Sequence, residues 1–217
     1  MKMHLTSLGT GITIALIATG CGTDSPSSDP SGPKTSSGGS AAIEMQGWTD
    51  FCDKADPDAI AEYLGASVVS IDEDEFTGEN TFDAIASGAC GGTLEFESGN
   101  SFPFQVALRA YDSAAEARAS LDEWRDADAG GIPANETGSK DGDLWIVQRE
   151  MGALDKIDGS IANDFYRITF TVSYPVYDEA NECGDSGPAC TEDPVATLQW
   201  FEATYLPELI AKVDATE

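Results

Sequence analysis

The clearest pattern in the chain is the alternation of apolar and polar side chains over residues 164–174. Such an alternation predicts a β-strand with one covered face and one wet face, which favours an antiparallel sheet. If helices leave part of the aromatic face uncovered, a ligand pocket would form there. The candidate ligand-facing residues are therefore Tyr166, Phe170 and Tyr174.

Three segments show helical spacing instead. An N-cap followed by proline at residues 56–57 predicts a helix that ends at Gly65. A capping box at residues 113–116 opens a second helix. A cap and a proline at residues 193–194 open a third helix, which Pro207 should kink or divide.

Four further runs are expected to be strands. Residues 67–71 are rich in β-branched side chains, a Ser-Gly-Asn turn joins residues 92–97 to 102–111, and residues 144–149 are mostly apolar. The resulting order, α-β-β-β-α-β-β-α, predicts an α+β domain. We expect an antiparallel sheet of about five strands, helices packed on one face, and two disulfides as staples.

The N-terminal residues have the features of an export signal. Lys2 precedes an apolar stretch that is too short to span a bilayer and ends in the sequence Ala-Thr-Gly-Cys at residues 18–21. This ending resembles a bacterial lipobox, in which the cysteine, here Cys21, is diacylated. The alternative is an ordinary secretory signal followed by an unrelated cysteine.

The chain therefore divides into three expected regions. Residues 1–20 form a lipoprotein signal peptide, and residues 21–45 form a lipidated cysteine with a disordered tether poor in apolar side chains. Residues 46–217 form the extracytoplasmic α+β domain. The expected location is the outer side of the cell membrane, where the lipid anchor makes the membrane itself a partner.

Acidic residues dominate the charge. Removing residues 1–20 takes away Lys2 and no acid, which moves the formal net charge from -28 to -29. Nucleic acid is excluded as a partner, because phosphate binding needs the opposite field. The acidic segments 72–83 and 178–193, expected to be loops, could instead face a cationic protein.

Four cysteines remain when Cys21 is acylated. An even number in an exported chain argues for two disulfides, although three pairings are possible. We favour Cys52–Cys90 and Cys183–Cys190. A thiolate metal site is the competing interpretation, but such sites expect paired short spacings and only one short pair is present.

The catalytic repertoire is narrow. The only histidine, His4, lies in the signal peptide, so the mature chain lacks the base of Ser-His-Asp and Cys-His mechanisms. Residues 183–188 resemble the nucleophile loop of trypsin-like serine proteases, yet one glycine of that pattern and the histidine are missing. Carboxylate-based hydrolysis needs only two acids, but no spacing selects a pair. We expect no catalytic residues.

Calcium is the remaining specific chemistry. Asp72 to Glu75 with Glu79, and the acids of residues 178–193, could each gather oxygen ligands. Neither segment follows the EF-hand spacing, so solvated loops are the simpler interpretation. We expect no metal and no cofactor.

Several of these features recur together in one family. Cys52 lies just before a helix that ends in Tyr-Leu-Gly-Ala at residues 63–66, Cys90 precedes a strand, and residues 111–118 open the middle helix. This pattern resembles small actinobacterial cell-wall lipoproteins of a domain-of-unknown-function family. It is distantly similar to extracellular sensor domains of bacterial serine/threonine kinases. The resemblance implies a non-catalytic envelope protein.

The expected function follows from these observations. The chain should be a membrane-anchored, non-catalytic binding or sensing module for an unknown small ligand. The first alternative is an envelope protein that binds a protein partner through its acidic loops. A carboxylate-based hydrolase is the third hypothesis.

Overall fold

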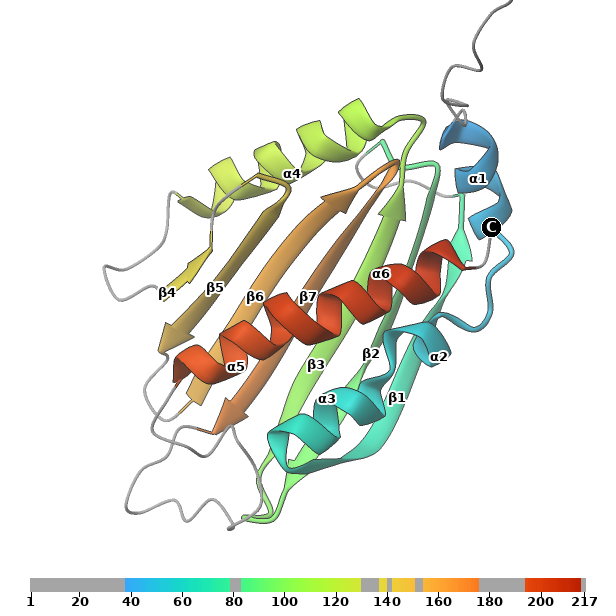
Figure 1. Ribbon diagram of the computed structural model, residues 1–217. Coiled ribbons are helices and arrows are strands. Elements are labelled where there is room, and N and C mark those ends of the chain that lie inside the picture. Colours follow the sequence, from blue (N-terminus) through green and yellow to red (C-terminus); the bar gives the residue numbers. More distant parts are fainter. Residues whose placement is uncertain are drawn as a thin grey trace, which may run out of the picture. The chain divides into compact units, whose positions relative to one another are not determined.

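The computed structural model describes residues 38–78, 83–129, 137–139, 142–150, 154–175 and 194–215. Within these residues, seven strands form one antiparallel sheet in the order β1-β2-β3-β7-β6-β5-β4 (Figure 1). The strands are β1 (Ala66–Thr77), β2 (Ala86–Phe96), β3 (Ser101–Ala110), β4 (Thr137–Ser139), β5 (Leu144–Glu150), β6 (Leu154–Asn163) and β7 (Tyr166–Pro175). The predicted α+β class with an antiparallel sheet is confirmed, but about five strands was too few, since β4 and β6 were not expected.

The side chains of β7 define the two faces of the sheet. The inner face carries Tyr166, Phe170 and Tyr174, and the outer face carries Thr169 and Thr171. Figure 1 shows the helices that lie across the inner face. They are α2 (Phe51–Ala55), α3 (Pro57–Leu64), α5 (Pro194–Trp200), the π-helical turn η2 (Phe201–Tyr205) and α6 (Leu206–Asp214).

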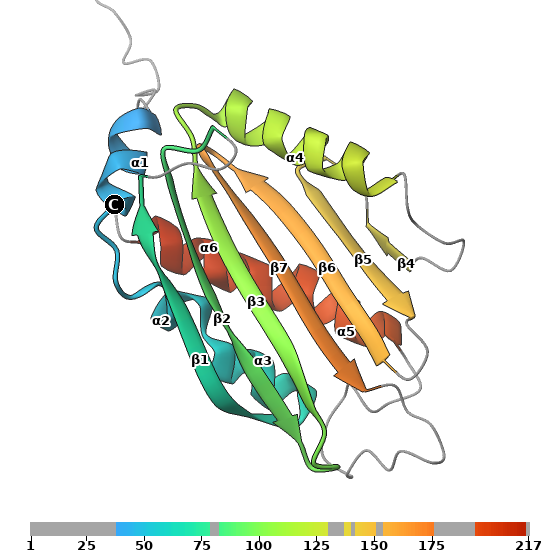
Figure 2. The same ribbon diagram turned by 180° about the vertical axis from the view of Figure 1, so that it is seen from behind.

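Helix α4 (Ala114–Ala129) packs on the opposite, outer face, so the prediction of helices on one face is wrong (Figures 1 and 2). Leu121 of α4 packs with Trp145 and Val147 of β5 and Ala162 of β6. The physical reason lies in β5, whose first four residues, Leu-Trp-Ile-Val, are all apolar. A strand that is apolar on both faces needs a cover on both sides.

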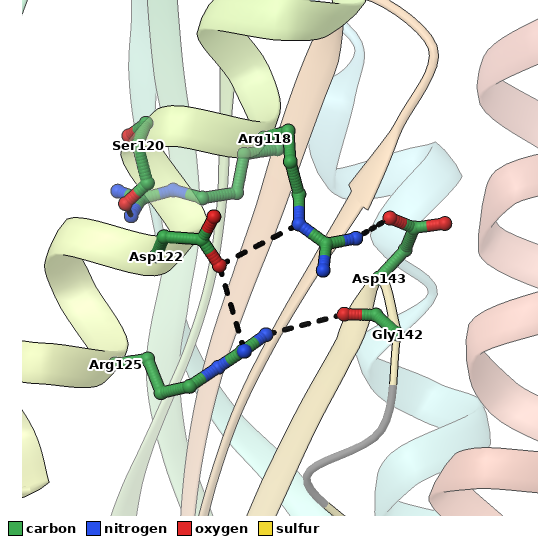
Figure 3. A network of polar contacts seen from close by, with 7 residues as sticks. Arg118, Ser120, Asp122, Arg125, Gly142 and Asp143 are labelled. Atoms are coloured by element: carbon green, nitrogen blue, oxygen red, sulfur yellow. Dashed lines mark hydrogen bonds and ion pairs between the residues drawn. The ribbon is translucent and has the colours of Figure 1, made fainter.

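Polar contacts also fix α4 over this end of the sheet (Figure 3). Arg118 forms ion pairs with Asp122, one turn along the helix, and with Asp143, next to the start of β5. Arg125 donates a hydrogen bond from Nη2 to the Gly142 carbonyl at 3.2 Å. From the sheet, Arg167 donates to the Ser120 carbonyl at 2.8 Å. These contacts join α4 to the residues before β5 and to the sheet.

The predicted helix starts are confirmed by their capping contacts. The Asp56 side chain accepts a hydrogen bond from the Ala59 N–H at 3.1 Å, and Gly65 ends α3 in the left-handed conformation with φ 65°. At α4, Ser113 Oγ accepts from the Glu116 N–H at 3.3 Å. These contacts satisfy backbone N–H groups that the helix itself leaves without partners.

The C-terminal helix is divided before Pro207, as predicted. The five residues of η2 form a π-helical turn between α5 and α6, and Pro207 lies in the first turn of α6. Proline removes one backbone donor and clashes with the carbonyl four residues earlier, so a wider turn before it relieves both problems. Within the described residues, no helix is long and apolar enough to cross a membrane.

The folded region begins earlier than expected. Helix α1 (Gly38–Met45) lies inside the segment that was predicted to be a tether through residue 45. Ala42 is fully buried and Met45 is 2% exposed, and both belong to the main core. These two apolar side chains, three residues apart, share one side of the helix, so the boundary at residue 46 was wrong. Cys21 and the signal segment lie outside the described residues.

A disulfide joins the inner helices to the sheet. Cys52 of α2 is bonded to Cys90 of β2 with a Cα–Cα distance of 5.0 Å, which confirms the first predicted pair. The two residues are 38 apart in sequence. By loop-closure entropy, the disulfide raises the free energy of the unfolded chain, and so stabilises the fold, by about 4 kcal/mol. Glu73 of β1 accepts a hydrogen bond from the Cys52 N–H at 3.1 Å. Cys183 and Cys190 lie outside the described residues.

Strand β1 replaces part of a predicted loop. The acidic residues 72–77 continue the strand predicted for 67–71, so the expected loop 72–83 begins too early. Residues 79–82 and 176–193, which include the second acidic segment, lie outside the described residues. Pairing with β2 overrides the weak strand propensity of acids, because β2 supplies the backbone partners.

Candidate functional site

The aromatic face predicted to hold a ligand belongs to the core. Tyr166, Phe170 and Tyr174 are 1%, 2% and 2% exposed. Phe170 stacks on Phe201 of η2 with ring centroids 5.0 Å apart, and the Tyr166 hydroxyl donates to Asp214 Oδ1 at 2.7 Å. Helices therefore cover the whole row, and the condition for a pocket on this face is not met.

The Tyr174 hydroxyl is a structural group as well. Burial, with the nearby Asp155 as a smaller cause, raises the pKa of Tyr174 above its ordinary value of 10.0. Burial likewise raises the pKa of Tyr205, whose hydroxyl donates to the Ala55 carbonyl at 2.6 Å and so joins η2 to α2. Both hydroxyls stay protonated at neutral pH, which suits packing rather than proton transfer.

The outer face offers the open surface. In Figure 2, α4 crosses one end of this face and leaves the strands β1, β2 and β3 uncovered beyond it. Two depressions of about 500 and about 410 Å³ lie there and share Asp74 and Gln105. We call them together the trough, whose outer-face lining includes Asp72, Asp74, Ser87, Ala89, Gly91, Gln105, Ala107, Arg109, Thr169 and Thr171.

Small and polar side chains make the floor of the trough. Ala89 of β2 pairs with Ala107 of β3, which in turn pairs with Thr169 of β7. Gly91 pairs with Gln105, which pairs with Thr171. These short side chains leave space above the strands, and the amide and hydroxyl groups supply hydrogen-bond donors and acceptors.

Charge is distributed unevenly along the walls. Strand β1 contributes Asp72, Asp74 and Glu75, all exposed, at one side of the trough. Arg109 lies at the other side and pairs with Arg167 across β3 and β7. Burial under α4, with Arg109 as a smaller cause, lowers the pKa of Arg167 below its ordinary value. The trough is therefore acidic toward β1 and basic toward α4.

A buried carboxylate on the outer face was missed by the sequence analysis. Asp158 of β6 is 5% exposed and accepts a hydrogen bond from Thr171 Oγ1 at 2.7 Å. Arg149 and Lys156 form ion pairs with the same carboxylate at 2.8 and 2.9 Å. Asp158 is occupied by three partners, which makes it a structural anchor rather than a free base. Lys156, Asp158 and Ser160 alternate with apolar residues, but Gly159 interrupts the apolar row, so the sequence gives only a partial signal for this strand.

The acids of β1 do not converge on one point. Asp72 and Asp74 face outward from the sheet while Glu73 faces inward, because successive residues of a strand alternate. Among the residues that the structure describes, no group of three cysteine, histidine or acidic side chains could hold a metal ion. The acids of residues 72–75, which the sequence analysis considered as oxygen ligands for calcium, are thus divided between the two faces, and Glu79 lies outside the described residues.

No protein-family model matches the chain, and no curated protein is significantly similar to it.

Proposed function

We propose that this protein is an extracytoplasmic lipoprotein whose domain binds a small polar ligand in the trough. The single observation that carries the proposal is the trough itself, an open polar surface backed by a fully packed core. The lipid anchor on Cys21 and the tether before α1 rest on the sequence pattern of residues 1–37. The chain's resemblance to actinobacterial cell-wall lipoproteins is consistent with this location.

The chemistry of the walls narrows the ligand class. Asp72, Asp74 and Glu75 favour a positive charge at the β1 side, and Gln105 with the threonines favours hydroxyl or amide groups in the middle. Arg109 adds a donor at the far side. A ligand with an amine and several hydrogen-bonding groups fits this order, for example an amino sugar or an amino acid. We assign it no catalytic step.

The second disulfide, Cys183–Cys190, is part of the proposal. It would close the segment between β7 and α5 into a short ring in the oxidising environment that export provides. By loop-closure entropy, this ring would raise the free energy of the unfolded chain, and so stabilise the fold, by roughly 2.5 kcal/mol. The protein would then carry no free thiol after acylation of Cys21.

Native mass spectrometry of the protein from an export-competent host tests these points together. A mass four hydrogens below that of the reduced chain is expected for two disulfides. A bound ligand is expected as extra mass, and Ala107→Trp should remove it because the indole fills the floor of the trough. Ser101→Trp is the matched control, since Ser101 lies on the same face of β3 at its other end.

Titration with a panel of amino sugars and amino acids complements this measurement. We expect at least one compound to bind the wild type and the Ser101→Trp variant, and to bind Ala107→Trp at least tenfold more weakly. Equal binding to both variants would place the ligand outside the trough. No binding by any compound, with no copurified mass, would overturn the proposal.

A protein-binding function is the second candidate. The observation that favours it is the edge strand β1, whose residues 69–75 are all exposed. This edge of the sheet is distinct from the floor of the trough.

A further inference from the structure

Strand β1 is an edge of the sheet. Within the described residues it pairs with β2 alone, and the unbroken run 69–75 is exposed. Val69 and Ile71 are 52% and 51% exposed, and they are two of the four large exposed apolar side chains in the described part of the chain. An edge strand presents a row of unpaired backbone N–H and C=O groups to any extended chain beside it.

The middle of β1 is regular enough to receive another strand. The pairing register with β2 shifts on either side of the segment Ser70–Asp74 but is continuous through these five residues. Bulges, lysines and prolines are the usual devices that protect sheet edges. Two register shifts border the segment, and no lysine or proline occurs in β1. The segment itself is protected only by its negative charge.

That charge excludes one kind of partner and favours another. Residues 72–75 are Asp-Glu-Asp-Glu, and β1 contains no cation. A second copy of this chain, paired edge to edge, would place acids beside acids, which is destabilising. A strand that carries lysine or arginine would gain opposite-charge pairs at the same positions. The charge of the edge therefore selects a cationic segment and disfavours self-association.

The alternation of β1 also sets the spacing of the partner's cations. Asp72 and Asp74 project from the outer face, so cations two residues apart would lie beside them. The position between those cations would lie on the inner side, near Ile71 and Glu73. Glu73 already accepts the Cys52 N–H, which leaves the apolar Ile71 as the contact for an uncharged side chain.

We propose that β1 binds an extended segment of a cationic partner protein, in which basic residues alternate with apolar ones, as an added strand. The partner's backbone would pair with the free edge of Ser70–Asp74, and its cations would lie beside Asp72 and Asp74. This site is the backbone edge of β1, whereas the proposed ligand site has its floor on β2, β3 and β7. Both sites use Asp72 and Asp74, so a variant of the floor, Ala107→Trp, is needed to tell the two proposals apart.

The test uses a short peptide in which lysine alternates with valine, and a second peptide with glutamate in place of lysine. Hydrogen exchange of the full exported protein is measured with each peptide. We expect the lysine peptide to protect backbone amides at every second residue of β1 between Ser70 and Asp74. The glutamate peptide should protect none of them.

Charge variants show whether the acids of β1 are responsible. The double variant Asp72→Lys/Asp74→Lys should bind the lysine peptide about tenfold more weakly, since two attractive pairs become repulsive. Glu202→Lys/Glu208→Lys changes the net charge equally at two exposed residues of the C-terminal helix and should bind like wild type. If the charge reversal impairs folding, Asp72→Asn/Asp74→Asn replaces it, with a smaller expected loss of affinity because the charges are removed rather than reversed.

Four results would overturn the proposal. One is an absence of protection in β1 with the lysine peptide, and another is an equal loss of affinity in the two reversal variants, which would indicate unspecific charge attraction. The third is a dimer in analytical ultracentrifugation that Asp72→Lys abolishes, because a second copy would then occupy the edge. Ala107→Trp should leave peptide binding unchanged, so a loss in that variant would assign the peptide to the trough instead.

Discussion

The inner and outer faces of the sheet are made by the same strands but differ in almost every property. On β7, the inner residues Ile168 and Val172 are fully buried, whereas the outer residues Thr169 and Thr171 are only half-buried. Helices cover the inner face from β1 to β5, while α4 covers the outer face only near β5, β6 and β7. One face therefore supplies the apolar core, and the other remains largely open.

This difference separates stability from function. A slip of one residue in the register of β7 would move its aromatic row to the open face, so burial of the inner face specifies the register strongly. The floor of the trough has no such constraint, because Ala107 and Thr169 bury little apolar surface against other elements. Substitutions there should alter the proposed ligand binding at little cost to folding.

The sharpest test of the comparison uses neighbouring residues of β7. Phe170→Ala should lower the free energy of unfolding by about 3–5 kcal/mol, because it leaves a cavity beneath Phe201. Thr169→Ala, one residue away on the outer face, should change it by less than about 0.5 kcal/mol. Urea denaturation with the disulfides intact measures both. Similar losses for the two variants would contradict the division into a stability face and a binding face.

A second test sharpens the same comparison with glycines. A Cβ on Gly159 of β6 would lie 2.2 Å from ring atoms of Phe170 on the inner face. Gly159→Ala should therefore cost about 1–3 kcal/mol in the free energy of unfolding. On the outer face, a Cβ on Gly91 would come no nearer than 3.4 Å to another atom, so Gly91→Ala should be nearly neutral.

A double-mutant cycle checks the cause of the Gly159 effect. In a Phe170→Leu background the ring is absent, so Gly159→Ala should cost less there, with a coupling above about 0.5 kcal/mol. Additive effects would show that the glycine is needed for the backbone of β6 rather than for the ring. Gly91→Ala should be additive with Phe170→Leu, since the two residues lie on opposite faces.

The same glycine explains why part of the fold could not be predicted. The inner residues of β6 read Ile157, Gly159, Ile161, and the gap in this apolar row is filled by Phe170 from the next strand. A sequence pattern shows only a strand's own side chains, so β6 was missed. The strands with complete rows, such as β7, and the helices with explicit caps, such as α3, were predicted from their residues alone.

The trough was even less accessible to sequence analysis. The alternation in β7 predicted that Thr169 and Thr171 lie on the wetter face. Which face would stay open depended on α4, whose position is decided by Trp145 and Val147 of β5 and by the contacts of Arg118 and Arg125. The lining comes from the consecutive strands β1, β2 and β3 and from β7, which follows only after α4 and three more strands, and no local pattern reports such a juxtaposition.

The weakest predicted effect concerns the margin of the inner layer, where Asp56 of the α3 cap accepts a hydrogen bond from Lys212 of α6 at 2.6 Å. This contact, above all, lowers the pKa of Asp56 below its ordinary value of 3.8. The stabilisation is therefore complete above the ordinary pKa and is lost as pH falls through the lower, folded-state pKa. Both side chains are 39% exposed, so solvent screening limits the ion pair to about 0.5 kcal/mol.

Asp56→Asn tests this pH dependence, because asparagine retains a capping oxygen and tolerates the positive φ of 50° at this position. Urea denaturation should show the variant slightly less stable than wild type from pH 5 to 8, with the difference shrinking as pH falls below the ordinary pKa of 3.8 and vanishing below the lower, folded-state pKa of Asp56. Lys212→Met should give a similar loss at neutral pH. A difference that persists undiminished in acid would mean that Asp56→Asn weakens the cap of α3, which does not depend on the charge of Asp56. The ion pair with Lys212 would then contribute nothing measurable to the contact between α3 and α6.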